Sequence, residues 1–157
     1  MNRDKLIYMD FFKRYYPIIL FFLIIAIICY DFSVRDDFKK NYKNQGEYAI
    51  GKINSIKGYG RGTGFYFLYS FKVGDKDYKG RSMVDLSFSE AEKNIDKRFL
   101  VLYLKHNIYN NRLYVSIPVN DKIKSNFELH RWVSCYPAIQ PKLDSIPGAG
   151  FFFENYF

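Results

Sequence analysis

The longest apolar run in the chain lies near its N-terminus. Ile18 to Tyr30 reads IILFFLIIAIICY, thirteen residues without a charge or a helix breaker. Widening the window to residues 15–32 gives eighteen residues with a single charge, Asp31. A helix that spans a bilayer needs about 20 mostly apolar residues, with a lower limit near 17. Aromatic side chains stand at both edges of the window, where the membrane interface favours them. The pattern therefore predicts a transmembrane helix over residues 15–32, with Pro17 in its first turn.

The residues around this run favour an uncleaved signal anchor. A cleaved signal peptide needs small residues at its cleavage site, and Cys29 is followed by Tyr-Asp-Phe. A lipoprotein signal also needs a small residue before the cysteine, where this chain has Ile28. The flanking Lys and Arg residues number four on each side, but Lys13 and Arg14 abut the run most closely. We therefore expect a single-pass protein of the cell membrane, with the bulk of the chain outside the cytoplasm.

Alternating apolar positions begin only after the anchor. Residues 1–14 predict an N-terminal arm. Residues 31–46 are polar and charged, with no stretch able to bury a core, and residues 33–46 predict a juxtamembrane linker or a continuation of the helix for a few turns. Residues 48–57 are rich in β-branched side chains and predict a strand, in which Gly51 is a candidate bulge. From Phe65 to Val73 apolar residues recur at period two, which predicts a strand. The tight-turn sequence after it and residues 76–82 predict a hairpin.

The rest of the middle region predicts one short helix and two more strands. Ser89 and Glu92 have capping-box spacing, which predicts a helix over residues 90–96. The continuous apolar run of residues 99–104 predicts a buried strand, residues 107–112 a turn, and residues 113–117 a final strand. The predicted fold is mainly β: one N-terminal transmembrane helix, then a small antiparallel sheet or partly open barrel of about five strands over residues 47–119, with one or two short helices.

These segments resemble a known group of proteins. The order is Gly51-Lys-Ile53, then a stretch from Tyr69 to Gly80 reading YSFKVGDKDYKG, then Phe99-Leu-Val101-Leu-Tyr103. This is similar to small bacterial single-pass membrane-anchored β-domain proteins of unknown function, which carry the pattern G-x-V, Y-x-F-x-V-x-G-x-x-Y-x-G and V-x-V-x-Y. The resemblance covers residues 48–117 and departs at Leu104-Lys-His-Asn, where the group has a proline-containing turn. It implies a compact antiparallel β-domain and supplies no catalytic residues.

The C-terminal region, residues 120–157, predicts a helix followed by an aromatic tail. Ser125 and Glu128 have capping-box spacing, and apolar residues then recur at helical spacing, which predicts an amphipathic helix over residues 126–136. Prolines at 137, 141 and 147 interrupt the segment after this helix. The chain ends FFFENYF, and five aromatics in seven residues are expected to pack on the domain, the bilayer interface or a partner.

The charge distribution and the cysteines do not indicate a specific function. The formal net charge is +8, of which +3 falls on residues 1–43 and +5 on residues 44–120. Basic residues beside an anchor suit contact with anionic lipid headgroups, whereas no Lys/Arg cluster exceeds a pair, so nucleic acid is not expected as a partner. The two cysteines, Cys29 and Cys135, are too far apart in this arrangement to indicate a disulfide.

No motif for catalysis, a cofactor or a metal is present. The glycines at 58, 60, 62 and 64 alternate with other residues and do not match a dinucleotide loop or a P-loop, so they predict a flexible hairpin loop. His106 and His130 have no Cys or His partner at metal spacing and read as surface residues. We therefore predict no catalytic, cofactor-binding or metal-binding residues, no cofactor, and a protein that is not an enzyme.

The remaining candidates are residues suited to interaction. They are the loop residues, the helix tryptophan and the tail aromatics: Tyr59, Arg61, Trp132, Phe151, Phe152, Phe153, Tyr156 and Phe157. The expected partners are the lipid bilayer and another membrane or envelope protein, for a membrane-anchored, non-enzymatic binding or envelope-associated accessory role. The sequence leaves the oligomeric state open.

Two alternative functions stay open. The first is an enzyme with a dispersed site that uses Asp85, Glu92 or His106. The second is a small basic barrel that binds nucleic acid on Tyr59, Tyr66 and Tyr69, with Lys57 and Arg61 nearby.

Overall fold

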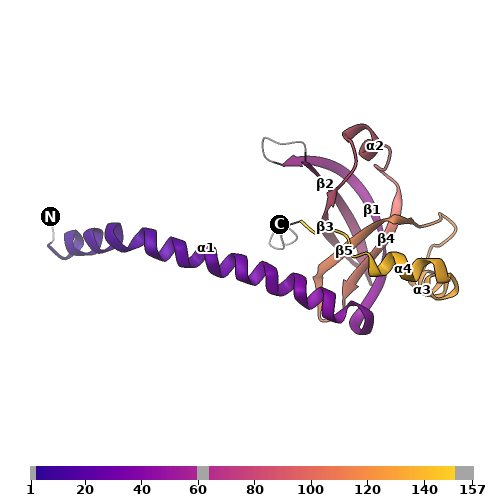
Figure 1. The fold of residues 1–157 in the computed structure, drawn as a ribbon, viewed down its shortest axis with the longest axis horizontal. Coiled ribbons are helices and arrows are strands. Elements are labelled where there is room, and N and C mark those ends of the chain that lie inside the picture. The colour runs from indigo at the N-terminus through magenta and orange to yellow at the C-terminus, as the bar shows by residue number, and fades with distance from the viewer. Residues whose placement is uncertain (1–2, 60–63, 151–157) are drawn as a thin grey trace.

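A long helix leads directly into a small sheet domain (Figure 1). The computed structural model describes residues 3–59 and 64–150, with side chains for 13–58 and 64–150. The elements, in chain order, are α1 (Arg3–Gln45), β1 (Gly46–Tyr59), β2 (Gly64–Val73), β3 (Lys76–Val84), α2 (Phe88–Glu92), β4 (Arg98–Leu104), β5 (Asn107–Pro118), α3 (Asn126–Cys135), the 3-10 helix η1 (Pro137–Ile139) and α4 (Gln140–Asp144).

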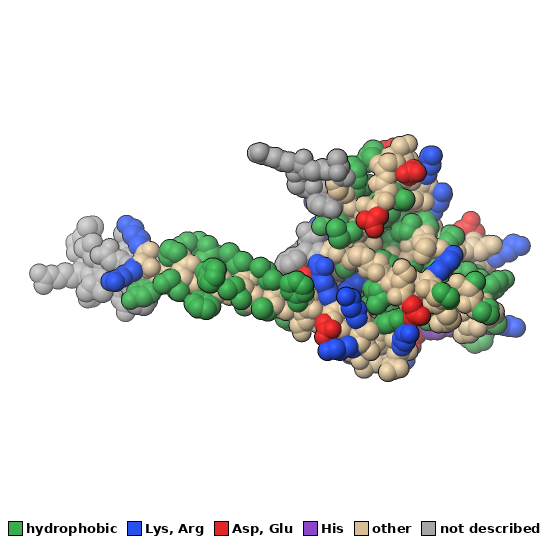
Figure 2. All heavy atoms as spheres, in the orientation of Figure 1, with side chains coloured by type: hydrophobic (Ala, Val, Ile, Leu, Met, Phe, Trp, Pro, Cys, Tyr) green, Lys and Arg blue, Asp and Glu red, His purple; other side chains and the backbone are tan. Residues whose placement is uncertain are grey.

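The helix α1 projects away from the domain and is covered with apolar side chains along its middle (Figure 2). Within the part of the chain that the structure describes, Lys13–Gln45 is the one helix long and apolar enough to cross a membrane, and its most apolar 18-residue window has a mean hydropathy of 2.5. Its side chains from Ile18 to Ile25 are all 40–64% exposed. Pro17 lies inside the helix, because α1 begins at Arg3, so the prediction that it occupies the first turn is wrong. Its ring removes the amide that would bond to the carbonyl of Lys13.

The last turns of α1 belong to the core of the domain. The helix runs without a break to Gln45, and Gly46 opens β1 directly. Phe38 is completely buried, Val34 nearly so, and Tyr42 packs partly against the same core. The prediction that residues 33–46 have no stretch able to bury a core is therefore wrong. A single helical stripe of apolar residues at 34, 38 and 42 is enough, because residues four apart share one helix face.

The five strands form one antiparallel sheet in the order β3-β2-β1-β4-β5, which curls into a half-barrel (Figure 1). Its first hairpin pairs Gly51 with Phe71 and Tyr59 with Gly64, and the register shifts between Ile53 and Ser55. The bulge therefore lies at Asn54, not at Gly51 as predicted. Gly51 serves close packing instead, because a Cβ there would lie 2.4 Å from the side chain of Val101.

The clearest predicted strand is confirmed. β2 covers Gly64–Val73, and Phe67, Tyr69 and Phe71 are buried on one face. β3 pairs with it from Lys76 to Val84 across a tight turn, where Gly74 has φ +59°. That left-handed conformation suits glycine. A hairpin with one buried face thus follows from the period-two pattern alone.

The last hairpin differs from its prediction. The turn lies at Lys105-His106, and β5 begins at Asn107, so residues 107–112 are strand and not turn. Asn110, Asn111 and Arg112 are buried within it. Asparagine-rich segments favour turns in isolation, but here the polar side chains find partners inside the domain.

Two cores lie on the two faces of the sheet. The inner core fills the half-barrel and consists of Ala49, Ile53, Phe67, Tyr69, Phe71, Ala91, Phe99, Val101, Tyr103 and Leu113. The outer core lies under α1, α3 and α4 and consists of Phe38, Leu100, Leu102, Leu104, Tyr114, Ile117, Val119, Leu129, Val133, Ile139 and Leu143. β4 contributes alternate residues to the two cores, which explains why its sequence is continuously apolar.

The short helices begin at capping boxes, one as predicted and one not. In α3 the Glu128 amide donates to the Ser125 hydroxyl at 3.2 Å, and the Ser125 amide donates to the Glu128 carboxylate at 3.2 Å. α2 instead starts after Ser87, whose amide and hydroxyl donate to Glu90 at 3.2 and 2.6 Å. The prediction that Ser89 caps this helix is therefore wrong. Ser87–Glu90 and Ser89–Glu92 have the same spacing, so the spacing alone does not distinguish them.

Candidate functional site

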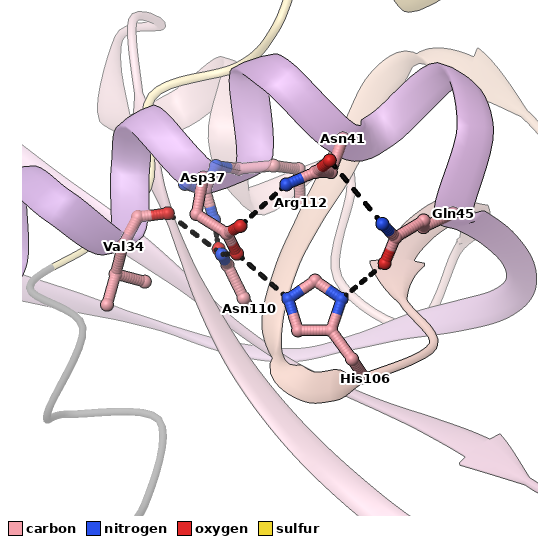
Figure 3. A network of polar contacts seen from close by, with 7 residues as sticks. All are labelled: Val34, Asp37, Asn41, Gln45, His106, Asn110 and Arg112. Carbon is pink, nitrogen blue, oxygen red and sulfur yellow. Dashed lines mark hydrogen bonds and ion pairs between the residues drawn. The ribbon is translucent and has the colours of Figure 1, made fainter.

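A polar junction joins α1 to the turn between β4 and β5 (Figure 3). The Nε2 atom of His106 lies 3.0 Å from a carboxylate oxygen of Asp37, and its Nδ1 lies 2.7 Å from the side-chain oxygen of Gln45. Asn41 donates to the other Asp37 oxygen at 2.7 Å. His106 therefore bridges two turns of the helix and fixes the end of α1 to the sheet.

Buried polar side chains of β5 extend this junction inward. The Asn110 amide nitrogen donates to the backbone carbonyl of Val34 at 2.8 Å, which pairs the strand with the helix (Figure 3). Arg112 donates through Nη1 to the side-chain oxygen of Asn110 at 3.2 Å and to the Asn111 carbonyl at 2.7 Å. Its guanidinium lies 4.4 Å from the ring centre of Phe38. Cation–π contact and hydrogen bonds together hold a buried cation against the helix.

A buried bond closes the half-barrel from the inside. The Tyr69 hydroxyl of β2 donates to the Asn111 side-chain oxygen of β5 at 2.5 Å, and burial raises the pKa of Tyr69 far above its ordinary value. The Asn111 amide in turn donates to the carbonyls of Ile108 and Tyr109. Gly80 of β3 leaves room for this contact, since a Cβ there would lie 2.4–2.5 Å from Tyr69 and Asn111.

Residues at the end of β3 and in the second half of β5 line a groove of about 510 Å³, which we call the seam groove. It is lined by Phe67, Ser82, Met83, Val84, Asp85, Leu86, Asn94, Leu113, Val115, Ser116, Ser145, Pro147 and Gly148. Two of these lining residues, Met83 and Leu86, are 39% and 41% exposed. The groove thus carries an apolar rim on the surface of the domain.

The edge of β3 at this groove already holds an extended segment. The Met83 amide donates to the Gly148 carbonyl at 3.2 Å, and the Gly150 amide donates to the Arg81 carbonyl at 3.3 Å. Ser82 and Ala149 form an antiparallel bridge. The edge strand is therefore partly covered by the chain itself, in the manner of strand addition.

Most of the predicted interaction residues lie outside the described side chains. Arg61 and the tail aromatics Phe151, Phe152, Phe153, Tyr156 and Phe157 fall there, and Tyr59 is described only as the last residue of β1. Trp132 lies on α3, packs partly against the outer core and has its ring centre 6.0 Å from that of Tyr136. Among the described residues no group of three His, Cys, Asp or Glu side chains is placed to hold a metal ion.

The residues of the alternative functions are not brought together. Asp85 follows β3 and Glu92 ends α2, at the end of the sheet where β4 begins, whereas His106 lies at the opposite end. Of the predicted aromatic platform, Tyr69 is buried in the inner core and bonded to Asn111. A side chain with 1% exposure has no face on which a base can stack.

Sequence reasoning missed the polar junction and the buried part of β5. The one available signal was the spacing of Val34, Phe38 and Tyr42, which marks an amphipathic continuation of the helix. No pattern in the residues around Asn110 or Arg112 indicates that they are buried, because Val34 and Phe38, which they contact, lie on α1.

Comparison with known proteins adds no further assignment. The chain matches no family model, and no curated protein or solved structure resembles it at a significant level. The similarity of residues 48–117 to membrane-anchored β-domains therefore stays an expectation from the sequence.

Proposed function

We propose that this chain is a single-pass membrane-anchored binding domain of non-enzymatic, accessory type. The observation that carries the proposal is that one part of α1 is exposed and apolar, whereas another part is buried in the domain. Its residues from Ile18 to Ile25 are exposed and apolar, whereas Phe38, thirteen positions beyond Ile25, is completely buried in the outer core. A helix shared in this way anchors the domain and also sets its orientation at the membrane surface, since no flexible linker separates the two parts.

The membrane part of the proposal is tested by flotation and alkaline extraction of the full chain. We expect it to stay with the lipid fraction and to be released when Leu23 and Ile24 are both replaced by Arg, because charges at the centre of a span are costly. Phe127→Arg, at a side chain 77% exposed on α3, is the matched control and should stay membrane-bound. Extraction of the unaltered chain by alkali would contradict the anchor.

Orientation can be read from the natural cysteines. Cys135 is exposed on α3, and Cys29 lies in the apolar part of α1. We expect a membrane-impermeant maleimide to label Cys135 in intact cells, with the label lost in Cys135→Ser. Labelling only after the cells are opened would place the domain in the cytoplasm instead.

The binding part of the proposal assigns an extended segment of a membrane or envelope protein to the seam groove. The apolar rim of Met83 and Leu86 supports this choice, and a partner would contact these side chains because the β3 backbone beside them is already paired with Gly148 and Gly150. A photo-crosslinking residue at Met83 should give one discrete adduct in cells, absent when it stands at Phe127 and abolished by Leu86→Asp. Adducts of equal yield at both positions would contradict a specific groove.

A further inference from the structure

Three basic side chains converge where α1 meets the domain. Arg35 and Lys39 of α1 and Arg112 of β5 line a pocket of about 200 Å³, together with Ile146, Pro147, Gly148 and Ala149. No carboxylate is among these lining residues. Figure 2 shows Lys and Arg side chains gathered at this junction of helix and domain. We call this cavity the basic pocket.

Arg112 is the buried member of the basic pocket. Its exposure is 5%, and its described hydrogen bonds go to the neutral oxygens of Asn110 and Asn111 through Nη1 alone. Burial lowers the pKa of Arg112 to about 10, so its guanidinium is still charged at neutral pH. Asp31 attracts this charge, and its own described ion pair is with Arg35. A buried cation whose described bonds go only to neutral oxygens is stabilised by an anion that enters beside it.

The two α1 side chains add charge that is not fully neutralised. Arg35 and Lys39 are four residues apart and therefore lie on one helix face. The Arg35 Nε lies 2.7 Å from a carboxylate oxygen of Asp31, so this cation is paired within its own helix. Lys39 is exposed and has no described ion pair, whereas its neighbour Lys40 pairs with Asp36 at 2.6 Å. Among the described side chains, Asp31 pairs directly with Arg35, and Asp37 is linked to Arg112 only through Asn110, so the pocket lining itself carries three cations and no carboxylate.

The basic pocket lies along α1 just beyond the apolar run, next to the level at which lipid headgroups would stand. Arg35 lies five residues beyond Tyr30, the last residue of the apolar run, and Lys39 lies nine residues beyond it. At 1.5 Å of rise per residue these positions stand roughly 8 and 14 Å past that run. The polar headgroup region occupies roughly 5–8 Å on each side of the hydrocarbon core. Arg35 therefore stands at the outer edge of the headgroup region, and the Lys39 side chain reaches back toward it because side chains on a helix tilt toward its N-terminus.

We propose that Arg35, Lys39 and Arg112 form a binding site for a phosphate group, supplied in the membrane by the headgroup of an anionic phospholipid. Only the lipid source of the phosphate rests on the proposed membrane anchoring. Guanidinium groups suit phosphate oxygens because their donors are arranged in a planar fork, and the lysine adds a point charge. A headgroup held here would bond to both the helix and β5, and would oppose rotation of the domain about the span.

The test compares Lys39→Gln with Lys40→Gln in the full chain purified in a neutral detergent. Both residues are exposed lysines on the same turn of α1, and only Lys39 lines the basic pocket. Three probes are titrated and followed by ³¹P NMR: inorganic phosphate, dihexanoyl phosphatidylglycerol and the zwitterionic dihexanoyl phosphatidylcholine. Circular dichroism of each variant confirms that its fold is retained.

We expect the anionic lipid to bind, and Lys39→Gln to weaken it about three- to tenfold while Lys40→Gln changes it less than twofold. Binding of inorganic phosphate with the same dependence on Lys39 would show that the phosphate alone is recognised. Anionic lipid without inorganic phosphate would show that the glyceryl part is needed. Equal weakening by both substitutions, equal binding of the zwitterionic lipid, or no binding of either anion would overturn the site. Flotation is independent of these titrations, so a failed anchor and a failed site are distinguishable.

Discussion

The Tyr69 hydroxyl and the Asn111 side-chain oxygen lie 2.5 Å apart inside the half-barrel and join β2 to β5, the two strands that the sheet order places three positions apart. This bond ties the edge strand β5 to β2, the neighbour of the other edge strand β3, across the curled sheet. Tyr69→Phe would leave the Asn111 oxygen without its donor in a buried site. We expect a loss of about 1–3 kcal/mol in the free energy of unfolding.

The measurement is denaturant unfolding of the full chain in detergent, followed by tryptophan fluorescence from Trp132. Tyr136→Phe removes a hydroxyl from a ring that is 55% exposed and is the matched control. A Tyr69→Phe variant as stable as this control would show that the bond contributes nothing to closure.

Gly80 is required by the same contact. A methyl group there would meet Tyr69 and Asn111 at 2.4–2.5 Å, so Gly80→Ala should cost about 1–3 kcal/mol of stability by overpacking. Gly58→Ala is the matched control, since its Cβ would meet only the ring of Phe65 at 3.9 Å. Equal thermal midpoints for the two variants would refute the close approach of β3 to β5.

Phe38 makes the end of α1 part of the domain. Phe38→Ala should lower the free energy of unfolding by about 3–5 kcal/mol, because it empties a completely buried aromatic site and removes the ring under Arg112. Phe32→Ala lies on the same helix at a side chain 68% exposed and should leave domain stability unchanged. The check is urea unfolding in detergent. Equal effects of the two substitutions would mean that the domain does not depend on the helix.

Glu128 predicts a pH dependence of stability. Its carboxylate accepts hydrogen bonds from the backbone amides of Lys124 and Ser125, at 2.8 and 3.2 Å, and these hold the pKa of Glu128 below its ordinary value of 4.5. Because the pKa is lower in the folded state than in the unfolded state, the contribution to stability is present above the unfolded value. It is lost as the pH falls below about 5.

The thermal midpoint of the unaltered chain should therefore fall more steeply than that of Glu128→Gln as the pH is lowered from about 5 to about 3. Glu92→Gln, an exposed residue at the end of α2, is the control and should keep the full slope. Identical slopes for all three proteins would show that the α3 cap does not contribute to acid sensitivity.

The elements set by local pattern were predictable from the residues alone. Period two from Phe65 to Val73 specified β2, and the Ser125–Glu128 spacing specified the start of α3. The apolar run from Ile18 to Tyr30 specified a helix able to cross a membrane. In each case the interactions that decide the element lie within a few residues of one another.

The tertiary structure alone decided which polar residues are buried and which partners they contact. Asn110 bonds to Val34 across 76 positions of sequence, and Tyr69 bonds to Asn111 across 42. Such partners meet only when the sheet curls and α1 packs on β4 and β5, so no local pattern records them. The same reason explains why Arg112, read in the sequence as part of a turn, becomes the buried cation of the basic pocket. Local periodicity determines helix and strand, whereas burial of polar groups depends on contacts between distant segments.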